Sequence, residues 1–96
     1  MYKEKSIAAV VPAYNEETQI TRVVETMPDW IDTILIVNDC STDKTSEVVK
    51  SLQSVHSKVL LIEHDSNQGV GGAIATGYQW VVDNNLDIAV IMAGDG

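Results

Sequence analysis

Residues 7–17 of the chain read IAAVVPAYNEE, and this stretch decides the fold. Its first five residues form an unbroken apolar run, which is too short for a typical helix and typical of a strand covered on both faces. Proline cannot donate to a sheet ladder, so we expect the strand to stop at Pro12. Asn15 is a favourable helix N-cap, and Glu16 and Glu17 would place negative charge at the positive end of the following helix.

The alternation of strand and helix continues along the chain. Further apolar runs predict strands at residues 34–37, 59–62 and 88–92, with a helix between each pair. Asn84 and Asn85 suit the end of the third helix, because Asn tolerates the left-handed conformation found there. The buried faces of the three helices are expected at Ile20, Val23, Val24 and Met27, at Val48, Val49, Leu52 and Val55, and at Ile74, Tyr78 and Val81.

Strands that alternate with helices predict an α/β fold with a parallel sheet and right-handed crossovers. We expect a Rossmann-like three-layer αβα arrangement with strand order 3-2-1-4, and residues 1–96 as one part of a single domain. The ligand cleft would open between the first and fourth strands. The fourth strand would be an uncharged apolar edge, which predicts self-association through it and a domain that continues beyond residue 96.

Composition excludes several classes of protein. The formal charge of -8 argues against a nucleic-acid partner, because phosphate backbones require clustered Lys and Arg. No apolar run reaches the roughly 20 residues that span a bilayer, and the N-terminus lacks the apolar core of a signal peptide. Cys40 is the single cysteine, so there is no internal disulfide, and we expect a cytoplasmic location, at the cytoplasmic face of a membrane if a longer protein carries membrane segments.

The unusual polar residues gather in four turns, each after a predicted strand. The turns read PAYNE, NDCSTD, HDSNQGVGG and AGDG. Because parallel strands bring their carboxyl ends to one edge of the sheet, the four turns together predict a ligand site. Carboxylates at these strand ends could recruit a divalent cation that holds a phosphorylated ligand.

Several of these residues also have structural interpretations. Asp39 could be a turn-forming residue bonded to its own backbone, and Asp43 is better explained as a helix N-cap. The glycines of residues 69–72 could cradle a phosphate at a helix start or could form a tight turn, and the sequence leaves both open. His56 and His64 have no third partner at metal-ligand spacing, so we expect a surface residue and a loop residue.

As an ordered series, the motifs VVPAYNEE, VNDCSTDKT, NQGVGGAIATGY and VIMAGDG resemble the family 2 glycosyltransferases, and polyprenol-phosphate sugar transferases among them. The resemblance covers essentially the whole chain and implies the N-terminal, nucleotide-sugar-binding half of a GT-A fold. It implies a hexosyltransferase that uses Mg²⁺ or Mn²⁺ and moves sugar from a nucleoside-diphosphate sugar to a polyprenyl phosphate or a saccharide. The alternative is a non-catalytic α/β module that binds a nucleotide or mediates assembly.

The resemblance also implies residue roles. Tyr14 would stack on the base, Asp39 would accept from a base or ribose donor, and Asp95 would hold the metal. The full set of implied substrate-binding residues is Pro12, Ala13, Tyr14, Glu16, Val37, Asp39, Gly94 and Asp95. The chain departs from the family pattern at Asn38 and Ala93, where Asp is usual. We therefore expect further metal ligands and the catalytic base beyond Gly96, and no transfer by residues 1–96 alone.

Overall fold

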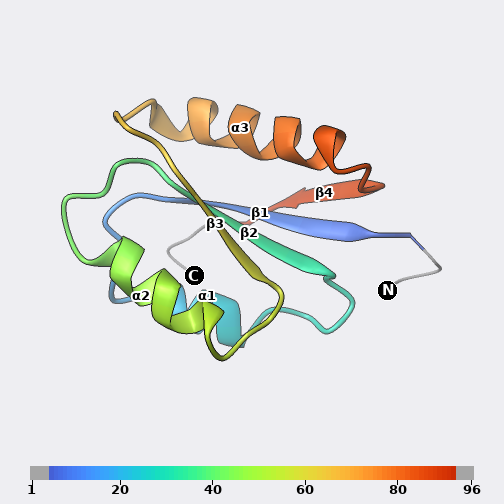
Figure 1. Cartoon of the computed structure of the whole chain (residues 1–96), viewed down its shortest axis with the longest axis horizontal. Coiled ribbons are helices and arrows are strands. Elements are labelled where there is room, and N and C mark those ends of the chain that lie inside the picture. Colours follow the sequence, from blue (N-terminus) through green and yellow to red (C-terminus); the bar gives the residue numbers. More distant parts are fainter. Residues whose placement is uncertain (1–4, 93–96) are drawn as a thin grey trace.

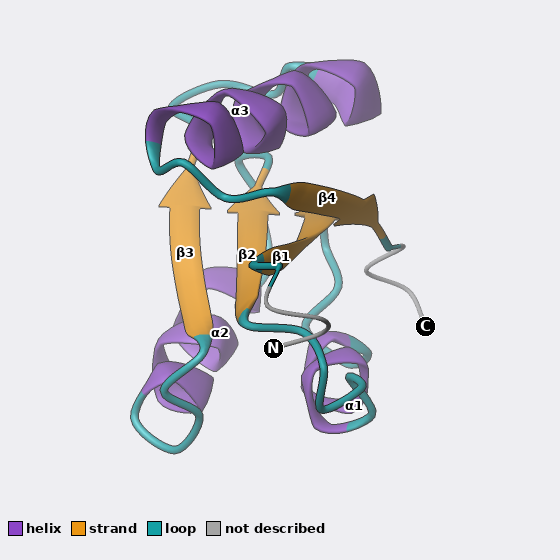
Figure 2. Cartoon of the chain, turned by 90° about the vertical axis from the view of Figure 1, so that its right-hand side faces the viewer, coloured by secondary structure: helices purple, strands orange, loops and turns teal. Residues whose placement is uncertain are grey.

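Four parallel strands form one sheet in the order β3-β2-β1-β4. The computed structural model describes residues 5–92. Helices α1 and α2 lie on one face of the sheet and α3 on the other (Figures 1 and 2). This arrangement confirms the predicted αβα fold and strand order. The elements are β1 (Ile7–Ala13), α1 (Ile20–Glu25), β2 (Thr33–Asn38), α2 (Thr45–Gln53), β3 (Val59–Glu63), α3 (Gly69–Asp83) and β4 (Ile88–Ile91).

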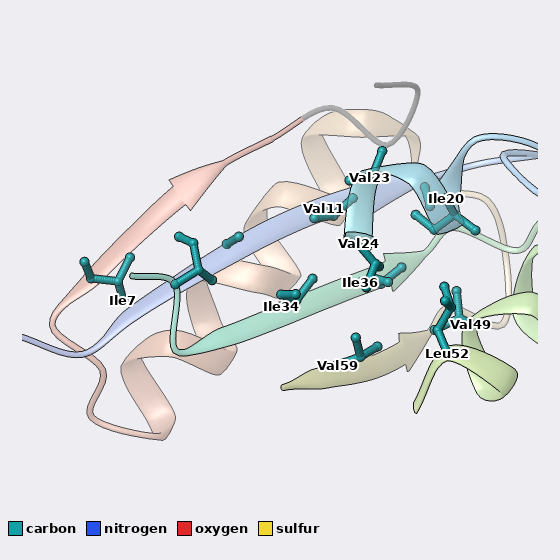
Figure 3. Close-up of a cluster of buried hydrophobic side chains, with 13 residues drawn as sticks. Ile7, Val11, Ile20, Val23, Val24, Ile34, Ile36, Val49, Leu52 and Val59 are labelled. Carbon is teal, nitrogen blue, oxygen red and sulfur yellow. The ribbon is translucent and has the colours of Figure 1, made fainter. Parts of the chain in front are cut away.

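The sheet divides the core into two clusters. Alternate residues of β1 point to opposite faces, so Val11 packs toward α1 and α2 while Val10 packs toward α3. Figure 3 shows the larger cluster, in which Ile20 and Val49 bring α1 and α2 onto the sheet. Because both faces are covered, the central strand is apolar throughout, as the opening run of the sequence predicts.

The expectation that the first strand stops at Pro12 is wrong, because β1 continues to Ala13 and pairs with β2 up to Asn38. The Ala13 carbonyl accepts from the Asp39 amide on the β2 side, whereas the Val10 carbonyl accepts from Met92 on the β4 side. Backbone polar groups of residues two apart along a strand point to the same side. The Pro12 nitrogen therefore faces away from β2, as the Val10 carbonyl does. The missing N–H therefore costs no bond between β1 and β2.

The expected helix start at Asn15 is also wrong. Helix α1 begins at Ile20, and its first turn contains no acidic residue. Asn15 has a left-handed φ of 55°, which Asn tolerates, and ends the run of extended backbone. The Glu16 carbonyl accepts from the amides of Gln19 and Ile20, so an irregular turn separates the strand from the helix.

The expected helix faces are partly confirmed. In α1, Ile20, Val23 and Val24 are buried, as expected. Val55 is 76 % exposed, because α2 ends at Gln53 and Val55 lies beyond the end of the helix. Asn85 adopts a φ of 58° just after α3, which confirms the expected end of that helix.

The buried face of α3 differs from the expectation. Tyr78 is 47 % exposed, and the residues that face the sheet are Ala73, Gly77 and Val81. A Cβ on Gly77 would lie 2.2 Å from Val10 Cγ1, so the helix approaches β1 as closely as a glycine allows. Small residues, and not the largest apolar ones, therefore decide which side of α3 meets the sheet. Within residues 5–92, no helix has the length and apolar character needed to cross a membrane.

Candidate functional site

A cavity of about 300 Å³ lies at the carboxyl ends of the strands. This volume is at the small end of the range typical of ligand pockets. Tyr14 follows β1, Asp39 follows β2, and Val70 and Ile74 come from the first turns of α3. The complete lining is Pro12, Ala13, Tyr14, Glu16, Asp39, Val70, Ala73, Ile74, Ile91 and Met92.

The structure brings together five of the eight residues predicted to bind substrate, namely Pro12, Ala13, Tyr14, Glu16 and Asp39. Val37 is absent from the lining; it shares the face of Asp39 but lies two residues earlier in the chain, where it is fully buried in the core cluster beneath α3. Gly94 and Asp95 lie outside the described residues. The cavity therefore contains the expected contributions of the first two strand ends.

A second cavity of about 320 Å³ lies at the opposite end of the sheet, against Ile34 and Lys58. The Lys58 ammonium group there donates to the carbonyls of Asp29 and Ile31, at 3.1 and 2.8 Å. The acidic side chains along its wall, Glu25 and Asp29, belong to exposed residues. Only the cavity at the carboxyl ends contains a buried carboxylate among the lining residues that the structure describes.

Hydrogen bonds join the turn after β1 to the turn after β2. The Asn15 amide donates to Ser41 Oγ at 2.9 Å, and the Thr42 amide donates back to Asn15 Oδ1 at 2.8 Å. One step further, the Glu16 amide donates to Thr45 Oγ1 at 2.9 Å. The conformation of the Tyr14 turn is thus fixed by the second turn, and Asn15 acts as a bridge between turns instead of a helix cap.

Asp43 supports this junction. Its carboxylate accepts from the amide of Thr45, the first residue of α2, at 2.9 Å. It also accepts from the Glu17 amide at 3.3 Å. Burial raises the pKa of Asp43, but the hydrogen bonds from Thr45 and Glu17 outweigh it and hold the pKa below its ordinary value. The expected N-cap position of Asp43 is wrong, because Lys44 occupies it, although the Asp43 carboxylate does accept from the first amide of α2.

Asp39 is the centre of the site. The residue is 3 % exposed, and its carboxylate accepts three hydrogen bonds of 2.8 Å. Gln68 N–H and His64 Nδ1 contact Oδ1, and Gly69 N–H donates to Oδ2. Burial raises the pKa of Asp39, but these hydrogen bonds and the charge interaction with His64 outweigh burial and hold the pKa below its ordinary value. Asp39 is therefore an ionised acceptor at the cavity wall.

The same contacts decide between the two interpretations of the glycine run. Gly69 has a φ of 80°, a conformation that favours glycine, and its amide is already bound to Asp39. A Cβ on Gly72 would lie 2.6 Å from the Gln68 Cβ. These observations favour a tight turn, in which Asp39 from a neighbouring strand satisfies the free amides at the start of α3.

His64 belongs to the site although sequence reasoning treats it as a loop residue. Its side chain is 7 % exposed and contacts Asp39 through Nδ1 and Thr76 Oγ1 through Nε2, each at 2.8 Å. One signal could have identified it. His64 directly follows β3, just as Asp39 directly follows β2, so both occupy the same edge of a parallel sheet.

Asn38 explains one departure from the family pattern. The side chain is buried, its Oδ1 accepts from the Ser41 amide at 3.2 Å, and its Nδ2 donates toward Glu63 Oε1 at 3.5 Å. An aspartate in this place would set a second carboxylate against Glu63. A neutral amide both accepts from Ser41 and donates to Glu63, so this environment favours Asn.

A metal ion is not accommodated by the described residues alone. Within residues 5–92, no three His, Cys, Asp or Glu side chains converge in a way that could hold a cation. Three of the roughly four acceptor positions of the Asp39 carboxylate are occupied by nitrogen donors, which leaves little room for it to ligate a metal. The predicted ligand Asp95 lies outside the described residues.

Fold and site together define an α/β protein with a cavity at the carboxyl edge of a parallel sheet. Residues 8–95 match the family described as Glycosyl transferase family 2, and the chain belongs to this family. The match confirms the resemblance inferred from the four turns.

Among its relatives is the UDP-N-acetylglucosamine--dolichyl-phosphate N-acetylglucosaminyltransferase of Methanococcus voltae, which is 37 % identical over 106 residues, covering 97 % of this chain and 42 % of that protein. The undecaprenyl-phosphate mannosyltransferase of Micrococcus luteus is 25 % identical over 92 residues, covering 94 % of this chain and 38 % of that protein. The chain thus spans about two-fifths of the length of these relatives.

A solved structure supports the fold. The mannosyltransferase PcManGT from Pyrobaculum calidifontis, determined in complex with GDP-Man and Mn²⁺, superimposes with a TM-score of 0.79 at 23 % identity. The match covers 93 % of this chain and 27 % of that one. This likeness shows a shared fold, and it agrees with the predicted GT-A architecture.

Proposed function

We propose that the chain is the donor-binding region of a glycosyltransferase, and that the cavity at the strand ends binds a nucleoside-diphosphate sugar. The observation that carries the proposal is the buried, ionised Asp39 in the wall of an otherwise largely apolar cavity. Residues 1–96 would then form the nucleotide-sugar-binding part of one domain. The named activities of the relatives and of PcManGT, all sugar transfers, support this assignment.

The proposed base contacts follow from the chemistry of the wall. Tyr14 is 46 % exposed and offers a ring face on which a base can stack, worth about 1–3 kcal/mol. An ionised carboxylate has roughly four acceptor positions, and three of those on Asp39 are used by the protein. About one remains, which suits a single ring N–H. Uracil and guanine each present such a group, so we propose a uridine or guanosine diphosphate sugar.

The remaining parts of the proposal concern groups outside the described residues. A divalent cation, Mg²⁺ or Mn²⁺, would supply charge neutralisation of the diphosphate, and it would depend on Asp95. The dolichyl and undecaprenyl phosphates in the names of two relatives make a polyprenyl phosphate the proposed acceptor, at the cytoplasmic face of a membrane. The part of the chain described here contributes donor binding and orientation, a matter of positioning.

Isothermal titration of the chain with UDP, GDP, CDP and ADP tests the proposal, first with Mn²⁺ and then with a chelator. We expect UDP or GDP to bind most tightly, with Tyr14→Ala weakening binding about tenfold through lost stacking. Asp95→Ala should abolish the dependence on Mn²⁺. Lys58→Gln, at the opposite cavity, is the matched control and should bind as the unchanged chain does. Binding that is unchanged in Tyr14→Ala but weakened in Lys58→Gln would refute the site.

The alternative, a non-catalytic module, is not favoured by the family match or by the named activities of the relatives. Nucleotide binding that is independent of metal and of Asp95 would favour it over a donor site. Because the chain covers about two-fifths of its relatives, transfer activity itself is to be assayed with a protein of the relatives' full length.

A further inference from the structure

We propose that His64 is a positioning residue that holds the Asp39 carboxylate at the cavity wall and ties it to α3 through Thr76. The consequence for nucleotide affinity rests on the proposed function, whereas the contact between the two side chains can be tested without any ligand.

The geometry fixes the imidazole ring at both ends. Nδ1 lies 2.8 Å from Asp39 Oδ1, and Nε2 lies 2.8 Å from Thr76 Oγ1. The side chains of His64 and Asp39 are 7 % and 5 % exposed, so water has little access to replace either contact. The backbone is fixed as well, because the His64 amide donates to the Asn38 carbonyl at 2.9 Å. The ring therefore has one orientation between β2, β3 and α3.

The direction of the hydrogen bond follows from the charge of Asp39. An ionised carboxylate only accepts, so Nδ1 carries the proton and donates to Oδ1. Nε2 is then the ring atom that contacts the Thr76 hydroxyl. The same hydroxyl also lies 3.0 Å from the Gly72 carbonyl within α3. Thr76 thereby connects the ring to the second turn of the helix.

His64 supplies a restraint that the other two donors cannot. Gln68 and Gly69 both donate through backbone amides at the start of α3, from one side of the carboxylate. His64 approaches from the end of β3 and is the one side-chain donor to this carboxylate among the described residues. Without it, the carboxylate is held only by the Gln68 amide at Oδ1 and the Gly69 amide at Oδ2, so its position at the cavity wall is less restrained.

Two substitutions separate the ends of the ring. In His64→Asn the amide nitrogen occupies the place of Nδ1 and can still donate to Asp39, whereas in His64→Gln it reaches the place of Nε2 and the donor to Asp39 is lost. We expect His64→Gln to weaken UDP or GDP binding about tenfold, the size expected for a lost hydrogen bond to a charged group. His64→Asn should restore most of the affinity, and Thr76→Val should cost less than His64→Gln.

A ligand-free measurement gives an independent readout. Carbon-13 NMR titration of the Asp39 carboxyl should show its pKa raised in His64→Gln, because a hydrogen bond and a charge interaction that lower it are removed. In His64→Asn the pKa should stay closer to that of the unchanged chain. The unchanged chain should also give a His64 Nδ1 proton signal that is protected from solvent exchange. This measurement does not depend on the folding of any variant.

The outcomes are distinct. If no nucleoside diphosphate binds the unchanged chain, the proposed function fails, and the carboxyl titration still decides the role of His64. If nucleotide binds but His64→Gln and His64→Asn behave alike in both affinity and titration, the positioning role is overturned. Absence of a protected Nδ1 proton would overturn it as well.

Discussion

Replacing Gly77 by alanine tests how α3 is seated on the sheet, and hence how the loop around Asp39 is held. The added Cβ would lie 2.2 Å from Val10 Cγ1 and 3.0 Å from Cγ2. Carbon atoms in contact normally lie about 3.5–4.0 Å apart, so the overlap exceeds about 1 Å. Val10 is fully buried in the central strand and is β-branched, so it has little freedom to move aside.

The expected magnitude combines two opposing effects. Alanine in a helix interior is favoured over glycine by about 1 kcal/mol. Overpacking a rigid core costs about 1–3 kcal/mol, and this overlap belongs at the upper end. We therefore expect Gly77→Ala to lower the free energy of unfolding by about 2 kcal/mol, which corresponds to roughly 8–16 °C in Tm for a domain of this size.

Urea unfolding followed by circular dichroism measures this loss. Gly71→Ala is the matched control, because a Cβ there meets nothing within 4 Å. It should leave the stability unchanged or raise it by up to about 1 kcal/mol. In a Val10→Ala background, Gly77→Ala should cost much less, since the clashing methyl groups are gone. Equal stabilities of the two single glycine variants would refute the packing argument.

Three further predictions concern charge and edges. Asn38→Asp should destabilise the chain by about 2 kcal/mol at pH 8 and by less at pH 5, because a buried carboxylate beside Glu63 is relieved by protonation; equal urea-unfolding losses at both values would contradict this. The free energy of unfolding should fall as pH drops below about 4. The pKa values of Asp39 and Asp43 are lowered in the folded chain, so the stabilising contribution of each carboxylate is present above its unfolded pKa and is lost on protonation. Asp39→Asn should make that decline shallower in acid titrations, and an unchanged slope would count against it. Ile88→Lys on the edge strand β4 should reduce self-association in sedimentation velocity, because an edge lysine opposes strand pairing. If the unchanged chain stays monomeric at every concentration, the prediction is wrong.

Much of the fold follows from short-range pattern. The run at residues 7–11 predicts a doubly covered strand because its apolar residues are continuous, and the alternation of strands and helices predicts a parallel sheet. The strand order is expected from the doubly wound folds that such alternation forms. The errors arise where long-range contacts override local preference. Asn15 is a good N-cap by composition, but its side chain bonds to Thr42 in another turn. Tyr78 fits an apolar stripe, but Gly77 allows the closer approach to the sheet.

The site was partly predictable for a similar reason. Tyr14 and Asp39 could be identified because each follows a strand that ends at the same edge. His64 occupies an equivalent place, yet one of the two partners that fix its ring, Thr76, is 12 positions away and on a helix. A pairing of that kind depends on how α3 packs, and no local pattern in the sequence encodes it. Val37 shows the converse, because it lies two residues before Asp39, where α3 covers it and buries it in the core.

The proposed nucleotide site unites the ends of β1 and β2 with the start of α3. Titrating the nitrogen-15-labelled chain with UDP and with GDP in the presence of Mg²⁺, and following every backbone amide by NMR, tests it most directly. We expect saturable shifts at Tyr14, Asp39 and Val70, with little change at His56 and Lys58. Saturable shifts at His56 and Lys58 instead, or no saturable shift with either nucleotide, would contradict it.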